Sequence, residues 1–312
     1  MLYNRSIIRT GQGGTRMKSF RGEICVILST LGFGSMGVLA KGIYESGYGV
    51  LATLTLRFYF ASLVLLAYLV LSKESFRLTK KQGLLLAAIG GFFYSAFSIC
   101  YFAGLRFTDA SIVAFVFALY PVIVTLLNFF FFHESMSKKK VLCLVLSVLA
   151  LYFLTRSPGA NVNFIGVVIS LVGGCLYAIY TMLLDHKDLQ SLSPVVTTFY
   201  IILSTGLVLS LLCLVRGERL LPISPSQGLS LLLLGIVSTA MAILTYNTGV
   251  RILGSTKASL IANFEALVST ILAMVFLGEY LTWIQWIGAF LMISVIFLIG
   301  SLDGKEASQK SS

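Results

Sequence analysis

The sequence predicts an all-α polytopic membrane protein whose ten transmembrane helices form two inverted five-helix repeats. Three observations lead to this fold class: the composition, the spacing of the apolar runs and an internal repeat. Of the residues, 57% are hydrophobic and 11% are charged. Soluble domains are about a quarter charged, so this chain has too few charges to cover a surface that faces water.

The apolar residues gather in runs of about 20, the length at which a helix crosses the hydrocarbon core of a bilayer. The expected spans are 23–44, 50–72, 82–104, 110–132, 139–156, 163–184, 195–216, 228–250, 257–278 and 282–301. The turns between them are short and leave no length for a soluble catalytic domain. The expected units are a cytoplasmic segment 1–21, five-helix repeats 22–156 and 163–301, and a disordered cytoplasmic tail 302–312.

The net charge of +11 indicates a topology rather than a nucleic-acid partner. With the N-terminus placed in the cytoplasm, the inner segments hold 17 of the 23 Lys and Arg residues and the outer ends hold 5. Positively charged residues concentrate on the cytoplasmic side of membrane proteins. We therefore expect a multi-pass protein of the plasma or inner membrane with both termini in the cytoplasm.

The N-terminus has no apolar core or cleavage site of a signal peptide, so none is expected, and Met17 is an alternative start. The five cysteines all lie inside apolar runs without metal or redox spacing: Cys25, Cys100, Cys143, Cys175 and Cys213. We expect them to behave as small apolar side chains.

The second half of the chain repeats the first. Residues 82–154 align with 227–299 at a constant offset of 145, with thirteen identities that include Tyr101/Tyr246 and Glu134/Glu279. Because each half has an odd number of spans, the second half must enter the membrane in the opposite direction. Many secondary transporters use such inverted repeats for alternating access around a site at the membrane midplane.

Three stretches of the sequence form a recognisable set of motifs. They are GFGSMGVLAKGIYESG (32–47), LRFYFAS (56–62) and a pattern ending in Glu that occurs twice, at 108–134 and 254–279. This set resembles the motifs of EamA-type carriers in the drug/metabolite transporter superfamily. The first stretch is similar to their first-helix signature, with Phe33 where a tryptophan is common and Lys41 closing the helix, and the second resembles the Arg-Phe motif of their second helix. The resemblance runs from about residue 20 to the end of the last span.

This resemblance implies ten helices, cytoplasmic termini and a central cavity lined by the first, third, fourth, sixth, eighth and ninth helices. It does not name a solute. Two departures matter: His133 replaces the usual glycine before Glu134, and Ala266 replaces the usual proline after Glu265. The second departure predicts that the ninth helix lacks an expected kink.

Glu265 lies in the apolar run LIANFEALVSTIL (260–272), about 12 Å from the start of its span at 1.5 Å rise per residue. Its helical neighbours are Ala262, Ser269 and Ala273, and small residues mark close helix packing in membranes. Glu265 therefore points into protein. It is either a protonated carboxyl bonded to a neighbouring helix or a site for a proton or an amine, with a gating or coupling role.

The third span carries Tyr94, Ser98 and Tyr101 on one helical face. Buried phenols need partners for their hydroxyls, so a convergent set could line a solute cavity. Tyrosines also form interfacial belts, which would suit Tyr101 and Tyr246. The expected cavity residues are Phe33, Tyr94, Ser98, Tyr101, Tyr177, Tyr180, Tyr246 and Asn263.

Four charged residues near span ends are candidates for gating. Arg57 and Lys41 either extend to the outer interface or form ion pairs that shape an outer gate. Glu134 and Glu279 follow their spans at opposite membrane faces and are read as helix-end anchors or gate pairs.

No bond-making chemistry is visible, and no enzyme activity, cofactor or metal is expected. His133 and His186 lie in connections without acidic or cysteine partners at ligand spacing, and no phosphate-binding loop is present. The sequence favours a secondary carrier or facilitator that exports amino acids or related amphipathic compounds, driven either by the solute gradient or by protons, with Glu265 as the candidate proton carrier. A carrier of nucleotide-type or cofactor-type metabolites and a membrane scaffold or sensor are the alternatives. Monomer and homodimer both remain open.

Overall fold

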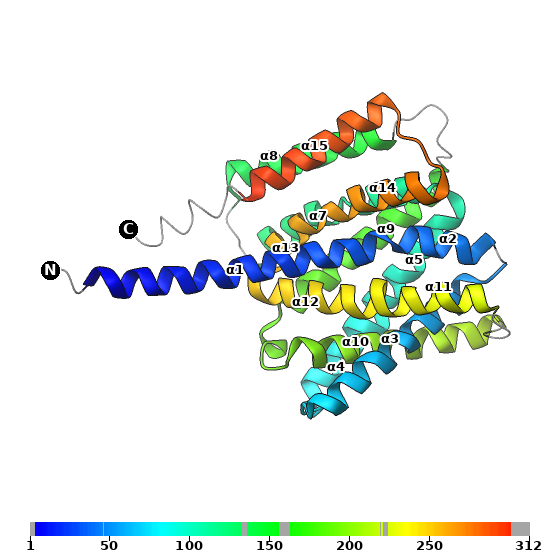
Figure 1. Cartoon of the computed structure of the whole chain (residues 1–312), viewed down its shortest axis with the longest axis horizontal. Helices are drawn as coiled ribbons and strands as arrows, with labels where there is room; N and C mark the ends of the chain where they lie inside the picture. The colour runs from blue at the N-terminus through cyan, green and yellow to red at the C-terminus, as the bar shows by residue number, and fades with distance from the viewer. Residues whose placement is uncertain are drawn as a thin grey trace.

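The computed structural model describes residues 4–45, 47–132, 136–155, 163–218, 220 and 224–300, and the regular elements in these ranges are helices (Figure 1). In chain order they are α1 (Asn4–Gly34), α2 (Met36–Glu45), α3 (Val50–Ser72), α4 (Lys80–Ala88), η1 (Ile89–Tyr94), α5 (Ser95–Phe107), α6 (Ala110–Phe117), α7 (Tyr120–Phe132), α8 (Lys138–Thr155), α9 (Phe164–Leu184), η2 (Lys187–Leu189), α10 (Pro194–Arg216), α11 (Pro225–Gly235), η3 (Ile236–Met241), α12 (Ala242–Leu253), α13 (Ser255–Ala262), α14 (Phe264–Leu277) and α15 (Trp283–Gly300). Of these, η1 and η3 are π-helical and η2 is a 3₁₀ turn.

Eight helical stretches in the described part of the chain are long and apolar enough to cross a membrane. They are Ser19–Tyr44, Val50–Ser72, Lys80–Phe107, Ile112–Phe131, Phe164–Leu184, Pro194–Arg216, Gln227–Leu253 and Ser255–Leu277. The protein is therefore an all-helical, multi-pass membrane protein. Eight of the ten expected spans are matched by such stretches.

The other two expected spans correspond to α8 and α15, which are 18 residues each and pack against each other beside the main bundle (Figure 1). A helix of that length is about 27 Å long, slightly less than the ~30 Å core of a bilayer. The first turn of α8 also holds Lys138, Lys139 and Lys140, which shortens its apolar part. The count of ten spans stays a prediction.

The internal repeat is visible as matching interruptions of the helices. The break between α6 and α7 and the break between α13 and α14 lie 145 residues apart, so that Ala118 corresponds to Asn263. The π-helical segments η1 and η3 interrupt the third and eighth stretches in the same way. These common interruptions confirm the two-repeat architecture.

The expected loss of the kink in the ninth helix is wrong. Although Ala266 stands where a proline was expected, α13 ends at Ala262 and α14 begins at Phe264. The reason is a tight turn of the backbone, in which the N–H of Ala266 donates to the carbonyl of Asn263 at 3.2 Å. At the break between α6 and α7 a similar turn lies one residue further along, where the N–H of Val122 donates to the carbonyl of Leu119 at 3.0 Å.

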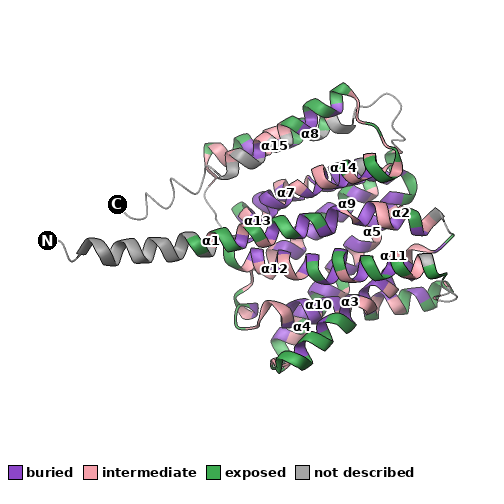
Figure 2. Ribbon diagram, viewed as in Figure 1, coloured by how far each residue is buried: buried purple, intermediate pink, exposed green. Residues whose placement is uncertain are grey.

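The buried residues are concentrated on the inner faces of the helices (Figure 2). Close packing of these faces depends on glycines at positions that the repeat relates to each other. A Cβ on Gly90 would lie 2.4 Å from the carbonyl oxygen of Ile201, and one on Gly235 would lie 2.6 Å from the Cβ of Phe60. A Cβ on Gly83, by contrast, meets nothing within 4 Å. The third span is therefore closely packed at Gly90 and open at Gly83.

We expect Gly90→Ala to lower the thermal unfolding temperature of the purified protein. Forcing a methyl group against backbone costs about 1–3 kcal/mol. Gly83→Ala is the matched control, because alanine is favoured over glycine in a helix by about 1 kcal/mol and should raise that temperature. If both variants changed the unfolding temperature by the same amount, the close packing described for Gly90 would be contradicted.

Candidate functional site

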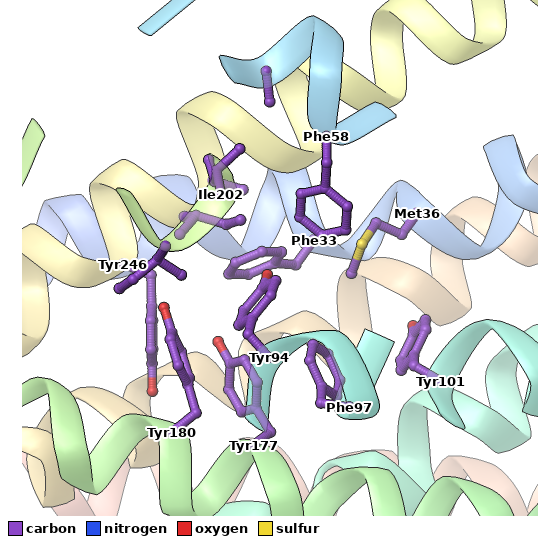
Figure 3. Close-up of a cluster of buried hydrophobic side chains, with 14 of the residues drawn as sticks. Phe33, Met36, Phe58, Tyr94, Phe97, Tyr101, Tyr177, Tyr180, Ile202 and Tyr246 are labelled. Carbon is purple, nitrogen blue, oxygen red and sulfur yellow. The ribbon is translucent and has the colours of Figure 1, made fainter. Parts of the chain in front are cut away.

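The predicted tyrosines form one aromatic cluster at the centre of the bundle (Figure 3). The ring centroids of Tyr94 and Tyr180 lie 4.8 Å apart, and those of Phe97 and Tyr177 lie 4.6 Å apart. Tyr246 joins the cluster through Tyr177 at 5.8 Å. Helices α5, α9 and α12 with η1 supply these side chains, so both repeats contribute to one core.

Two further predicted residues belong to the same cluster. The ring of Phe33 lies 6.2 Å from that of Tyr246, and the ring of Tyr101 lies 6.0 Å from that of Phe97. Tyr101 and Tyr246 are 1% and 0% exposed, so they lie in the core and not in an interfacial belt. The predicted Ser98 and Asn263 are buried as well.

Tyr120 was not among the predicted site residues, although it is a central member of the cluster. Its ring lies 5.0 Å from Phe117 and 4.9 Å from Tyr177, and its hydroxyl donates to the carbonyl of Ser259 at 3.3 Å. The repeat contains the signal that could have found it, because the offset of 145 aligns Tyr120 with Glu265.

The hydroxyls of the cluster divide into two groups. On one side the Tyr180 hydroxyl donates to Asn247 at 2.7 Å, Asn247 donates to Thr198 at 2.9 Å, and the hydroxyls of Thr181 and Tyr246 lie 3.1 Å apart. This side of the cluster is a satisfied hydrogen-bond network.

The other side of the cluster is different, because its buried polar atoms have no hydrogen-bond partner among the described residues. They are the hydroxyls of Tyr94, Ser98, Tyr101 and Ser269, both side-chain atoms of Asn263, and Oε1 of Glu265. Buried polar groups in proteins are almost always hydrogen-bonded. These exceptions come from η1, α5, α14 and the residue between α13 and α14.

Glu265 lies in this unpartnered group and is 5% exposed. It follows Asn263 in the first turn of α14, directly after the helix break, and it interacts electrostatically with Tyr94 and Tyr101. Within the described residues no cation lies at ion-pair distance from Glu265. An unpaired carboxylate is costly at this depth, which favours the protonated form when no cation is bound.

Arg57 neither extends to the outer interface nor forms an ion pair among the described residues, so neither expectation for it holds. It is 0% exposed, and its guanidinium lies 4.6 Å from the ring centroids of both Phe58 and Phe102. Its Nη1 donates to the sulfur of Met36 at 3.0 Å. Because the two rings flank the guanidinium, the side chain is held in the core.

At one end of the bundle, Lys41 and Glu279 form an ion pair at 3.2 Å. Asp109 lies 3.8 Å from the same ammonium group, and the backbone N–H of Ala110 donates to Glu279 at 3.2 Å. These contacts join the middle of α2, the start of α6 and the residues after α14. We name this group the Lys41 clasp.

At the opposite end, Lys257 pairs with Glu23 at 2.9 Å, and the backbone N–H of Ser255 donates to Asp185 at 3.3 Å. These contacts join the second half of α1, the start of α13 and the end of α9, and we name them the Lys257 clasp. The equivalent helices α6 and α13 thus begin at opposite ends of the bundle, as an inverted repeat requires.

The Lys257 clasp was not predicted, although the repeat again contains part of the signal. An offset of 144 aligns Lys41 with Asp185, and an offset of 145 aligns Ala110 with Ser255. In each clasp a carboxylate accepts a hydrogen bond from a backbone N–H in the first turn of α6 or of its equivalent helix α13. Glu134 and His133 lie outside the described residues.

Removing a hydroxyl should have opposite consequences in the two parts of the cluster. Tyr180→Phe leaves the side-chain Oδ1 of Asn247 without its donor and should cost about 1–3 kcal/mol of stability. Tyr94→Phe removes a hydroxyl without a described partner, so it should leave stability unchanged or raise it while lowering the affinity for a solute. Thermal unfolding of both variants checks this, and a destabilised Tyr94→Phe variant would contradict it.

Comparison with known proteins identifies the family. The sequence profile of the EamA-like transporter family matches residues 20–156 and 164–301. The chain belongs to this family. The two matched ranges agree with the two repeats of the fold, and membership establishes membrane transport as the general activity.

The relatives agree with this assignment and do not specify a solute. An uncharacterized transporter of Archaeoglobus fulgidus is 26% identical over 89% of this chain and 95% of its own length. The uncharacterized transporter YxxF of Bacillus subtilis is 24% identical over 82% and 81% of the two chains. A solved crystal structure with 17% identity covers 90% of this chain and 96% of its own, with a TM-score of 0.71, and shows the same fold.

Proposed function

We propose that this EamA family member is a secondary carrier that exports amino acids or related amphipathic compounds from the cytoplasm. The observation that carries the proposal is the buried set of unpartnered polar atoms around Tyr94, Tyr101 and Glu265, which lies inside an aromatic core. The aromatic rings can contact the apolar part of an amphipathic solute, and the unpartnered polar atoms can form hydrogen bonds with its polar groups.

The two clasps support an alternating-access cycle. The Lys41 clasp and the Lys257 clasp close opposite ends of the same bundle, so opening one of them exposes the core to one side only. An inverted repeat gives both ends the same range of movement. We assign ten spans, a plasma or inner membrane and cytoplasmic termini to this carrier, which places the Lys257 clasp on the cytoplasmic side.

Glu265 is the proposed coupling residue. It is buried without a cation partner among the described residues, and a change in its charge would alter the relative free energies of the two open states. A proton that enters from outside and binds Glu265 could thus drive the outward movement of a solute. Glu279 and Lys41 act as gate residues in this scheme.

Counterflow in proteoliposomes tests the proposed function without assuming a solute. Vesicles with the purified protein are loaded with an unlabelled extract of small metabolites and placed in a dilute, uniformly isotope-labelled extract. Mass spectrometry should find at least one labelled compound concentrated inside, compared with protein-free vesicles. If no compound accumulates with a protein whose folding is verified by thermal unfolding, the carrier function is wrong.

A further inference from the structure

Arg57 is a buried cation whose function the fold alone does not explain. Its side chain is among the largest fully buried ones, and it is the one Lys or Arg with this degree of burial among the described residues. Within the described part of the chain, no carboxylate lies at ion-pair distance from it. Removing a charge from water costs several kcal/mol unless a partner compensates.

The groups around Arg57 satisfy it only in part. A thioether sulfur is a weak acceptor, and the Nε of Arg57 has no partner among the described residues. The rings of Phe58 and Phe102 stabilise the charge through cation–π contacts and hold the planar guanidinium in a fixed orientation. A planar guanidinium whose Nε–H lacks a partner and whose Nη1 donates only to a weak acceptor is suited to bind a carboxylate, which accepts two parallel hydrogen bonds from arginine.

The surroundings place Arg57 beside the unpartnered polar group of the core. The ring of Phe58 contacts Tyr94 at 5.9 Å, and Figure 3 shows Met36 and Phe58 facing Tyr94 and Tyr101. The charges of Arg57 and Glu265 both influence these two phenols, although neither residue forms a hydrogen bond with them. The two phenols therefore lie in the region between a buried cation and a buried carboxyl.

We propose that Arg57 binds the carboxylate of the transported solute while Glu265 binds its ammonium group, so that the solute is a zwitterion. This inference rests on the proposed carrier function and assigns the two ends of the solute to named residues. The hydroxyls of Tyr94, Ser98 and Tyr101 complete the hydrogen bonds of the bound solute. A nucleotide would need several cations, and the described core supplies one.

The same arrangement explains how a proton could be exchanged for the solute. An ammonium group binds the ionised carboxylate of Glu265, so the proton leaves this residue when the solute enters. When the solute leaves, the carboxylate again lacks a cation and takes up a proton. Proton and ammonium group compete for one carboxyl, which is the condition for coupled exchange.

A set of matched compounds tests the inference on the wild-type protein. Each of the twenty standard amino acids is compared with its amide, which lacks the carboxylate, and with its N-acetyl derivative, which lacks the ammonium group. The readouts are the ligand-induced shift of the unfolding temperature and competition in counterflow. We expect at least one amino acid to bind roughly 10- to 100-fold more tightly than either derivative, the range for one lost hydrogen bond to a charged group.

Two variants then show which residue binds the carboxylate of the solute and which binds its ammonium group. In Arg57→Gln the preference for the amino acid over its amide should disappear, while the preference over the N-acetyl derivative remains. Glu265→Gln should give the reverse pattern. Arg106→Gln is the control, because Arg106 is exposed and its guanidinium lies over the ring of Tyr44 at 5.5 Å, and it should keep both preferences.

The outcomes separate the inference from the function on which it rests. A wild-type protein that carries some compound of the labelled extract but binds no amino acid, or binds the derivatives equally well, overturns the inference and leaves the carrier standing. An Arg57→Gln variant that keeps the preference over the amide also overturns it. If that variant does not fold, the wild-type comparison alone decides, since it needs no substitution.

Discussion

Replacing Glu265 with glutamine is expected to abolish solute movement driven by a proton gradient, with a loss of at least tenfold in the initial rate. Glutamine has nearly the same shape as glutamate, so the core keeps its packing. Its amide does not bind or release a proton at the pH values of the experiment, so the core loses a titratable group. The measurement is efflux from solute-loaded proteoliposomes after an acidic jump outside. Unfolding temperatures verify that the variant is folded.

Glu74→Gln is the control for this experiment. The side chain of Glu74 accepts a hydrogen bond from the hydroxyl of Ser193, and an amide oxygen can accept the same bond. The initial efflux rate of Glu74→Gln and the change of that rate after the pH jump should equal those of the wild type. An unchanged pH response in folded Glu265→Gln would remove this residue from the coupling mechanism.

Lys41→Met should shift the protein towards conformations that are open at the Lys41 clasp. The side chains of Lys41 and Glu279 are 22% and 15% exposed, so solvent screens their attraction only in part. Couplings of about 1–3 kcal/mol change conformational equilibria by roughly 5- to 150-fold. The reporter is Ser269→Cys in a protein without its native cysteines. We expect Lys41→Met to raise the rate at which a membrane-impermeant maleimide labels this cysteine by roughly 5- to 150-fold.

A second ion pair serves as the control for the first. Lys81 pairs with Asp188 at 2.7 Å, yet the Lys81 side chain is 75% exposed, and exposed pairs contribute less than about 1 kcal/mol. Lys81→Met should leave the labelling rate almost unchanged. Equal labelling of Lys41→Met and the wild type would show that the clasp does not hold this end closed.

The sequence was sufficient to predict the helical membrane fold, the repeat and most of the aromatic core. Hydrophobic length determines which segments can cross a bilayer, and helical periodicity places Tyr94, Ser98 and Tyr101 on one face whatever the neighbours are. The family resemblance was confirmed by the match to both repeats. The roles proposed for individual site residues stay predictions.

What could not be predicted depends on contacts between distant segments. The position of Arg57 is decided by Phe102, which lies on another span, and the pair Lys257–Glu23 joins residues 234 positions apart. The kink at Asn263 depends on a backbone turn rather than on a proline. In each case hydropathy and periodicity indicate which face is buried but not which partner faces it.

The symmetry of the scaffold is not shared by its charges. The repeat aligns Glu265 with Tyr120, and the offset of 144 that relates the first two spans of each half aligns Arg57 with Ile201. The fold is thus doubled, while among the described residues the buried cation and the buried carboxyl each occur in one repeat only. Such a core can hold a solute in one orientation while both ends of the bundle open by related movements.

Exchange kinetics test the central claim of a carrier with one core site most directly. Vesicles are loaded with the labelled compound identified by counterflow, and its efflux is followed with and without the same unlabelled compound outside. A carrier that opens to one side at a time predicts faster efflux when the outside solute is present, because the loaded core returns more readily than the empty one. Efflux that is unaffected by the outside solute would indicate a passive pore and would contradict the alternating-access account.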